Sequence, residues 1–241
     1  YTKTFGGRVI SFCQDEFLSN KGVLNESIVS TELGLKGIPS ISESINLYRD
    51  IEILSYSGGK IHIPYVTTSK GVNLIREAKK NNLDITASVS LAHITFSEKD
   101  IPEFNTNFKL IPPLRSESDL NSLKEGLIDG TIDYLTSMHE PFDIDNKKNV
   151  FDNASSGSIG LESMFGLMSN QFTLEKTIDI LTRKKIIFEV DDHPIEIGSL
   201  ADLSLFNPDK NYNFSENHIL STSKNCAFID SKHKPIVYGS I

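Results

Sequence analysis

The sequence predicts an α/β fold built on a parallel sheet. Between residues 6 and 137, apolar strand-like runs alternate with amphipathic helical patterns, and Gly58 and Gly130 stop two of those patterns. Strands that alternate with helices pair in parallel through right-handed crossovers. Two architectures satisfy this order: an open doubly wound sheet, and part of a (β/α)8 barrel. No G-x-G-x-x-G or Walker motif follows a strand, which weakens a nucleotide-binding version of the open sheet.

Four runs have the composition of strands. The first, 6–13, is a glycine-led apolar run, and the third, 84–90, alternates between apolar and polar residues. The second, 60–68, contains Pro64, which a central strand tolerates only near its end. The fourth is 131–137. In a barrel, functional residues lie where the strands end. The corresponding positions here are Phe12, Tyr65, Ala92, His93, Met138 and His139.

Four segments have the pattern of amphipathic helices. In the first, 40–59, leucine and isoleucine recur at i, i+4 and i+7, which predicts one buried face. Ser40 and Glu43 have the spacing of a capping box at its start. Further helices are expected over 69–82, 116–130 and 173–185.

Composition excludes several classes of protein. The 241 residues carry a net charge of −8 that is spread along the chain, so nucleic acid and anionic membranes are not expected partners. Cys13 and Cys226 are far apart and lack C-x-x-C spacing, which predicts two buried, reduced thiols. The sequence shows neither a transmembrane run nor a secretory leader, so we expect a cytoplasmic protein.

Five segments carry a family resemblance. Together, and in this order, they resemble dihydroorotase, the amidohydrolase-superfamily enzyme that closes carbamoyl-aspartate to dihydroorotate in pyrimidine synthesis. The segments are 25–54, with Leu35, Gly37, Ile38, Pro39, Glu43, Arg49 and Asp50; 111–135, which opens with Ile-Pro-Pro-Leu-Arg; 157–165, with Gly-Leu-Glu; 195–209, with the superfamily's Gly-x-x-Ala-Asp-Leu signature; and 221–228, with Ser-Lys-Asn and a final Phe.

The resemblance implies a particular fold and division of the chain. Residues 1–190 would form the later, C-terminal part of a (β/α)8 TIM-type barrel with its closing helices, and 191–241 a small β-sandwich element. Half a barrel leaves strand edges unpaired, so we expect about four more strands before Tyr1 in the natural chain.

The resemblance also implies a binuclear zinc site at the barrel mouth, with two histidines and a carboxylate supplied upstream of Tyr1. Three further ligand positions fall in this sequence and hold Phe12, Tyr65 and Met138, where the family has two histidines and the aspartate that is also the general base. Three positions of the family's substrate site are Ile111, Phe142 and Gly157.

These replacements remove zinc-binding chemistry. Zinc needs nitrogen, oxygen or thiolate donors at about 2 Å. A phenylalanine ring offers none, a thioether is a poor zinc ligand, and tyrosine binds only as phenolate, far below its usual pKa of ~10. We therefore expect no metal, no cofactor and no catalytic residue, and apolar side chains filling the vacated site.

Two polar residues remain as candidates for residual ligand binding. Arg115 could hold a carboxylate, although a salt bridge is the commoner role, and His139 could hold a ligand, although a structural role is commoner. His62 has the position of a hydrogen-bonded core histidine, and His93 that of a structural one. A hidden serine-hydrolase site finds no G-x-S-x-G motif.

Three functions are consistent with these residues. The first is an inactive dihydroorotase homologue with a structural role, a homo-oligomer for which the resemblance suggests aspartate transcarbamoylase as a partner. The second is an active zinc-dependent cyclic amidohydrolase whose ligands come from upstream of residue 1. The third is a small-molecule binding module that uses the old pocket through Arg115.

Overall fold

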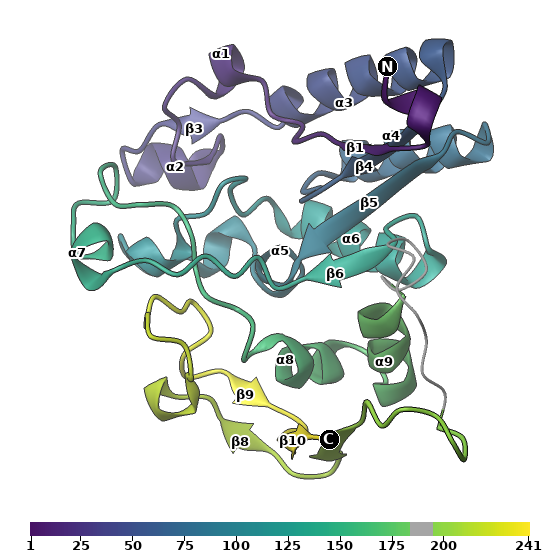
Figure 1. Cartoon of the computed structure of the whole chain (residues 1–241). Coiled ribbons are helices and arrows are strands. Elements are labelled where there is room, and N and C mark those ends of the chain that lie inside the picture. The colour runs from purple at the N-terminus through teal and green to yellow at the C-terminus, as the bar shows by residue number, and fades with distance from the viewer. Residues whose placement is uncertain (184–194) are drawn as a thin grey trace.

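A four-stranded parallel sheet forms the centre of the computed structural model, which describes residues 1–183 and 195–241. Its strand order is β1–β4–β5–β6 (Figure 1). The bounds are Arg8–Ile10 for β1, Lys60–Ile63 for β4, Ile85–Ser90 for β5 and Tyr134–Thr136 for β6. Every neighbouring pair is parallel, so the predicted α/β class with a parallel sheet is confirmed.

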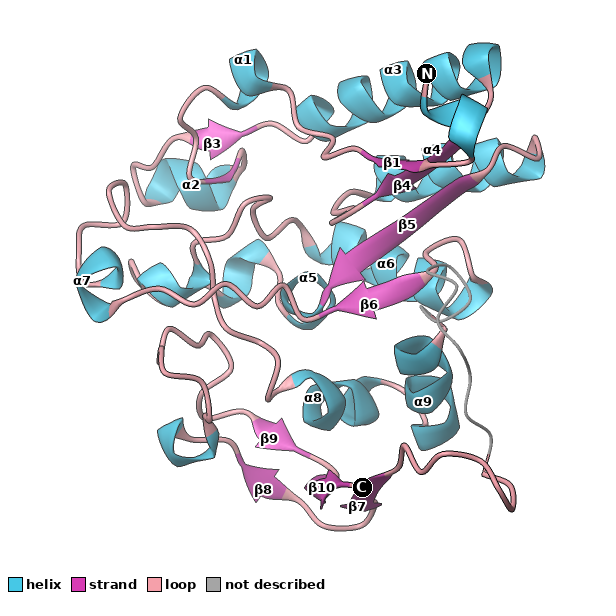
Figure 2. Cartoon of the chain, in the orientation of Figure 1, coloured by secondary structure: helices cyan, strands magenta, loops and turns pink. Residues whose placement is uncertain are grey.

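Three amphipathic helices cover one face of this sheet. They are α3 (Ile41–Ser57), α4 (Ser69–Lys80) and α6 (Glu117–Asp129), and all three match predicted segments (Figure 2). Alternate residues of β5 face them, because Ala87 and Val89 belong to the main hydrophobic cluster together with residues of these helices. Pro64 follows directly after β4, as its missing N–H requires.

The other face of the sheet is polar. His62 hydrogen-bonds through its two ring nitrogens to Thr86 (2.9 Å) and Ser88 (3.2 Å), and the Tyr134 hydroxyl lies 2.9 Å from Nε2. The Tyr134 ring stacks on the imidazole at 5.2 Å. Burial lowers the pKa of His62 to about 4, and the charge of Arg8 adds to this effect. The predicted role of His62 as a hydrogen-bonded core histidine is confirmed.

Short elements connect and extend this core, and periodicity did not predict most of them because each is only a few residues long. The helices are α1 (Glu16–Ser19), α2 (Ile28–Glu32), α5 (Leu91–Thr95), α7 (Ile144–Lys147), α8 (Met164–Gln171) and α9 (Leu174–Thr182), the last matching the predicted segment 173–185. Short strands β2 (Leu24–Asn25) and β3 (Gly37–Ile38) pair in parallel. The 3-10 turns are Thr2–Phe5, Glu98–Asp100, Thr106–Phe108 and Glu216–His218.

The C-terminal region contains two antiparallel strand pairs. They are β7 (Ser204–Asn207) with β10 (Ile236–Ser240) and β8 (Tyr212–Asn213) with β9 (Lys232–His233), and they lie below α8 in Figure 1. The short-stranded texture expected there is thus present. The predicted domain boundary, 190/191, lies outside the described residues.

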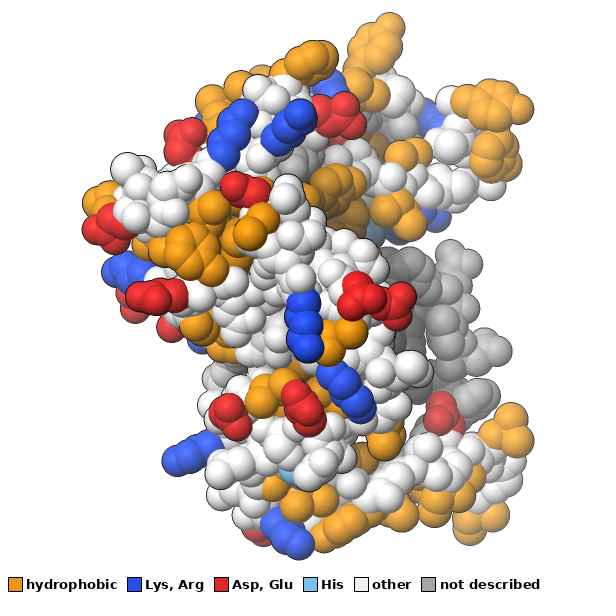
Figure 3. Space-filling view, turned by 90° about the vertical axis from the view of Figure 1, so that its left-hand side faces the viewer, with side chains coloured by type: hydrophobic (Ala, Val, Ile, Leu, Met, Phe, Trp, Pro, Cys, Tyr) orange, Lys and Arg blue, Asp and Glu red, His pale blue; other side chains and the backbone are white. Residues whose placement is uncertain are grey.

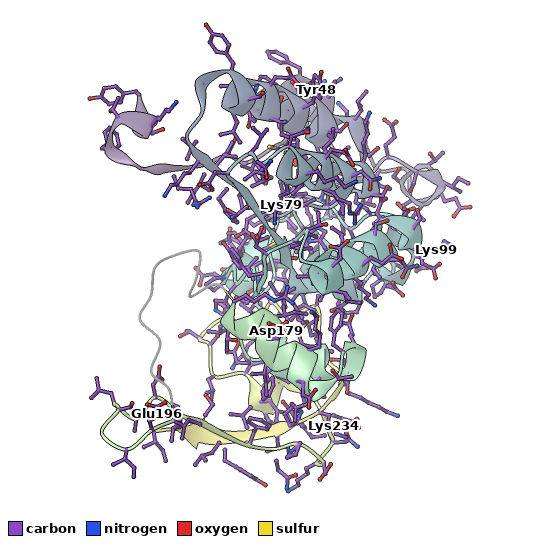
Figure 4. All side chains as sticks on the ribbon, turned by 90° about the vertical axis from the view of Figure 1, so that its right-hand side faces the viewer. Tyr48, Lys79, Lys99, Asp179, Glu196 and Lys234 are labelled. Atoms are coloured by element: carbon purple, nitrogen blue, oxygen red, sulfur yellow. The ribbon has the colours of Figure 1, made fainter. Side chains whose placement is uncertain are left out.

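Apolar side chains are exposed along the β1 edge and the outer side of α3. Val9 and Ile10 of β1 are exposed, and so are Ile45, Tyr48 and Tyr56 of α3. Figure 4 shows Tyr48 on α3, at the end of the molecule far from Lys234. An unpaired strand edge beside an uncovered apolar helix face is usually covered by another part of the same protein or by a partner. The expectation of additional strands before Tyr1 stays a prediction. In the part of the chain that the structure describes, no helix is long and apolar enough to cross a membrane.

A buried carboxylate fixes α3 to the loop that follows β4. Glu43, 4% exposed, accepts hydrogen bonds from the backbone N–H groups of Thr67 and Thr68 (2.9 and 3.1 Å) and from both hydroxyls. The predicted capping box of Ser40 and Glu43 is therefore wrong, since Ser40 makes no side-chain cap and Glu43 reaches across to the neighbouring element instead. Four donors satisfy the carboxylate, so burial of its charge is offset.

We predict that Glu43→Gln lowers the free energy of unfolding by about 2–3 kcal/mol, because an amide group turns two donors toward a site that contains only donors. The control is Glu52→Gln on the exposed side of the same helix, with an expected change within about 0.5 kcal/mol. Urea unfolding of both variants measures the difference. Equal losses in the two variants would contradict this role of Glu43.

Candidate functional site

Three predicted site residues lie at one edge of the sheet. Phe12, Tyr65 and Met138 each follow a strand by two residues, after β1, β4 and β6. Because these strands are parallel, their carboxyl ends share one edge. Tyr65 and Met138 have φ values of 55° and 46°, in the left-handed region that non-glycine residues seldom adopt. The backbone is therefore strained at two of the three positions.

The environments of these three side chains differ. Met138 is buried, at 4% exposed, whereas the Phe12 ring is 45% exposed. Tyr65 is intermediate, and burial together with the Glu140 carboxylate raises the pKa of its hydroxyl. The expectation that apolar side chains fill a vacated metal site stays a prediction. Met138 is buried, whereas the described chain leaves Phe12 partly uncovered.

The remaining strand of the sheet, β5, leads directly into α5. His93, buried in that helix, donates its Nε2–H to the carbonyl of Pro112 (3.0 Å) and accepts at Nδ1 from Ser90 (2.6 Å). Burial lowers the pKa of His93 to about 4. The imidazole thus joins the end of β5 to the segment before α6, which fits the predicted structural role.

The segment after β6 docks against residues 157–158. Its backbone is fixed at Glu140, whose N–H donates to the carbonyl of Ser158 (3.0 Å) and whose carbonyl accepts from Asn225 Nδ2 (2.9 Å). Gly157 has φ 139°, and a methyl group placed on it would lie 2.5 Å from Glu140 Oε2 and 2.7 Å from Phe142 Cε2. Phe142 and Gly157 are therefore neighbours. Ile111, 38% exposed, precedes Pro112 at a cis peptide bond.

Two buried lysines hold the loop that leads to Gly157. Lys109 Nζ donates to the carbonyls of Asp152 (2.9 Å) and Ala154 (2.7 Å), and Lys147 Nζ to those of Ser155 (2.8 Å) and Gly157 (2.9 Å). Burial, reinforced by the neighbouring Lys109, lowers the pKa of Lys147 to about 8. Sequence analysis missed both, because lysine side chains are usually solvated and only the folded loop buries these two.

His139 belongs to a hydrogen-bonded cluster with a serine and a glutamate. Its Nδ1 accepts from the N–H of Leu161 (3.3 Å), so Nε2 of the neutral ring carries the proton and donates to Ser221 Oγ (3.3 Å). Ser221 in turn donates to Glu162. A serine nucleophile needs an unprotonated nitrogen facing it, so this order of donors does not activate Ser221. His139 is thus a structural hydrogen-bonding residue in this arrangement.

A polar cavity of about 510 Å³ lies beside this cluster. Its lining includes His139, Phe142, Asp143, Asn146 and Ser221. Figure 3 looks at the side toward which the strands point, and it shows basic and acidic side chains interspersed with hydrophobic ones. The described part of this face therefore shows no large patch of a single charge.

Comparison with known proteins decides the family. The chain is 36% identical over 250 residues to the dihydroorotase of Caldanaerobacter subterraneus subsp. tengcongensis, a match covering 100% of this chain and 57% of that protein. It is 34% identical over 228 residues to the dihydroorotase of Listeria monocytogenes, covering 92% and 54%. The chain belongs to the dihydroorotase family. It spans little more than half the length of these curated relatives. No family model matches the sequence.

Solved structures settle the architecture. A D-hydantoinase superposes with a TM-score of 0.83 at 21% identity, over 99% of this chain and 56% of that one. The dihydroorotase from Saccharomyces cerevisiae in complex with 5-fluoroorotic acid superposes with a TM-score of 0.72 at 14% identity, over 99% and 65%. These neighbours are TIM-barrel amidohydrolases, so the dihydroorotase-like chain has the fold of part of that barrel, as predicted.

The strand-end residues of this dihydroorotase-like chain do not fit zinc. Phe12 has no donor atom, Met138 has a thioether, and the pKa of Tyr65 is raised, which disfavours the phenolate that could bind a metal. Within residues 1–183 and 195–241, no three His, Cys, Asp or Glu side chains form a group that could hold a metal ion. The backbone at Tyr65 and Met138 nonetheless keeps a left-handed conformation that His and Asp adopt more readily.

Arg115 lies in the buried polar network around Glu43. Its guanidinium, 3% exposed, donates to Asn25 Oδ1 (2.7 Å), to the carbonyl of Ile38 (2.7 Å) and to Thr67 Oγ1 (3.3 Å). These acceptors are neutral, so the described residues form no salt bridge of the kind expected for Arg115. Burial lowers its pKa. The geometry assigns Arg115 a structural task, and a role in ligand binding stays untested.

We predict that Gly157→Ala lowers the free energy of unfolding by about 1–3 kcal/mol, since the new methyl group meets Glu140 and Phe142 on a backbone with positive φ. Gly130→Ala is the matched control: φ there is +81°, but nothing lies within 4 Å of the added carbon. Thermal unfolding should show a larger loss at 157. A larger loss at 130 would mean that crowding at Gly157 is unimportant.

Proposed function

We propose that this chain is a dihydroorotase homologue that does not catalyse the family reaction. The observation that carries the proposal is the donor chemistry at three strand ends. Phe12, Tyr65 and Met138 occupy the positions where the family resemblance places two zinc-binding histidines and an aspartate. A zinc hydrolase needs a metal to activate water and polarise the carbonyl, and a base to move the proton. None of these three side chains supports either task.

The hydrogen-bonded networks around these positions are complete, which supports a retained scaffold rather than a decaying fold. The four-donor site of Glu43, the lysine contacts to the 152–157 loop and the docking of residues 138–142 on Asn225 are all present. Such networks are costly when incomplete. Their completeness suggests that the folded shape still has a use.

The use that we favour is structural, in an assembly of pyrimidine-synthesis enzymes. Exposed apolar side chains on β1 and α3, and Leu205, Val237 and Tyr238 on β7 and β10, need covering by more of the same protein, by a second copy or by a partner. A homo-oligomer, and association with aspartate transcarbamoylase, are the forms of assembly that the resemblance suggests. Co-purification with that enzyme tests the second.

The central test compares the chain with its reversion Phe12→His/Tyr65→His/Met138→Asp. We expect the reversion to bind zinc at least about tenfold more tightly than the natural sequence, because three ligands of the right type return to one edge. Zinc titration with a chromophoric chelator measures this, and a dihydroorotase assay with added zinc accompanies it. The Listeria monocytogenes dihydroorotase is the active control.

Two results would contradict the proposal. One is zinc binding by the natural chain as tight as that of the reversion. The other is turnover of carbamoyl-aspartate or dihydroorotate by the natural chain with added zinc. Either would favour the alternative, an active zinc-dependent cyclic amidohydrolase whose essential ligands lie elsewhere.

A further inference from the structure

Glu140 adds a negative charge to a position that is uncharged in the family motif. Residues 138–142 read Met-His-Glu-Pro-Phe. The resemblance to dihydroorotase aligns them with the family's Asp-His-Ala-Pro-His motif, so a carboxylate stands where that motif has a methyl group. The backbone of Glu140 is held on both sides, by Ser158 and by Asn225, so its side chain starts from a fixed point. Loss of the zinc ligands does not by itself explain a new carboxylate at this place.

The side chain of Glu140 lies over Gly157, at the old substrate site. A methyl group on Gly157 would come within 2.5 Å of Oε2 and 2.8 Å of Cβ of Glu140, and the Phe142 ring lies beside them. The carboxylate is also close enough to Tyr65 to raise the pKa of that hydroxyl. Glu140 thus lies against two former substrate positions, Phe142 and Gly157, and near Tyr65, a former metal-ligand position.

The charge of Glu140 has no close partner among the described residues. Its carboxylate makes no hydrogen bond to them and no ion pair within 4.0 Å. Burial raises the pKa of the Glu140 carboxyl, and the charge of Lys147 lowers it, but the Lys147 ammonium group donates to the carbonyls of Ser155 and Gly157. A half-buried carboxylate without a direct partner repels a second anion more strongly than a solvated one would.

We propose that Glu140 is a specificity determinant that excludes anionic pyrimidine acids from the old substrate site. The inference rests on the proposed function, because it concerns the same site, in which Phe12, Tyr65 and Met138 replace the metal ligands. Phe142 contributes because it stands where the resemblance places a substrate-binding histidine, and Glu140 contributes by placing a like charge over Gly157. Together they turn a site built for a carboxylate-bearing ligand into one that rejects it.

The test uses two probes that differ by one carboxylate, orotate and uracil. Binding of each to the natural chain, to Glu140→Ala and to Glu140→Gln is measured by isothermal titration, after melting curves confirm that the variants fold. We expect orotate to bind both variants at least about tenfold more tightly than it binds the natural chain, and uracil binding to change less than about threefold in Glu140→Gln. Glu216→Gln, an exposed carboxylate lining a neighbouring cavity, should leave orotate binding unchanged.

Three outcomes would overturn the proposal. Orotate could bind the natural chain as tightly as the variants. The affinities for orotate and uracil could rise equally in the variants, which would indicate that the substitutions act by opening space and not by removing a charge. The third possibility is that neither variant binds orotate detectably, which would show that Glu140 is not the residue that excludes it. None of these results depends on zinc or turnover, so failure here is distinguishable from failure of the proposed function.

Discussion

The hydrogen bonds of the buried Glu43 carboxylate are the interaction on which the geometry at the carboxyl ends of the strands depends. The carboxylate accepts hydrogen bonds from Thr67 and Thr68. Thr67 Oγ1 in turn accepts from Arg115, which also donates to Asn25 and to the carbonyl of Ile38. One network therefore ties α3, the loop after β4, the segment before α6 and the β2–β3 pair. These are the connections at the carboxyl ends of the strands, so the network sets where Tyr65 and its neighbours lie. Removing one member leaves the others buried without partners, which makes such a network costly to disturb.

At the carboxyl ends of the strands, the backbone conformation and the side-chain chemistry suit different residues. Tyr65 and Met138 keep φ values that suit histidine and aspartate, but they offer no ligand that fits zinc. The fold is that of part of the family's barrel, and the docking of residues 138–142 and the lysine-held loop are in place. This edge of the sheet thus combines a complete hydrogen-bonded frame with side chains that do not fit zinc.

Sequence reasoning succeeded where periodicity dominates and failed where tertiary contacts decide. The helices α3, α4 and α6 and the four sheet strands follow repeating apolar patterns that burial against one sheet requires. The capping box at Glu43 failed because a carboxylate near a helix start can serve a neighbouring loop equally well. Lys109 and Lys147 were missed for a similar reason: their partners are carbonyls of a loop whose path no local pattern encodes. Family motifs located Phe12, Tyr65, Met138 and Gly157, but not the placement of the Glu140 side chain over Gly157.

The central claim is that the edge formed by Phe12, Tyr65 and Met138 no longer holds zinc. The most direct measurement is X-ray diffraction at the zinc absorption edge from crystals of the chain soaked with zinc. We predict no anomalous peak between these three side chains. A peak there at about 2 Å from Tyr65 Oη, with density for further ligands around it, would contradict the account.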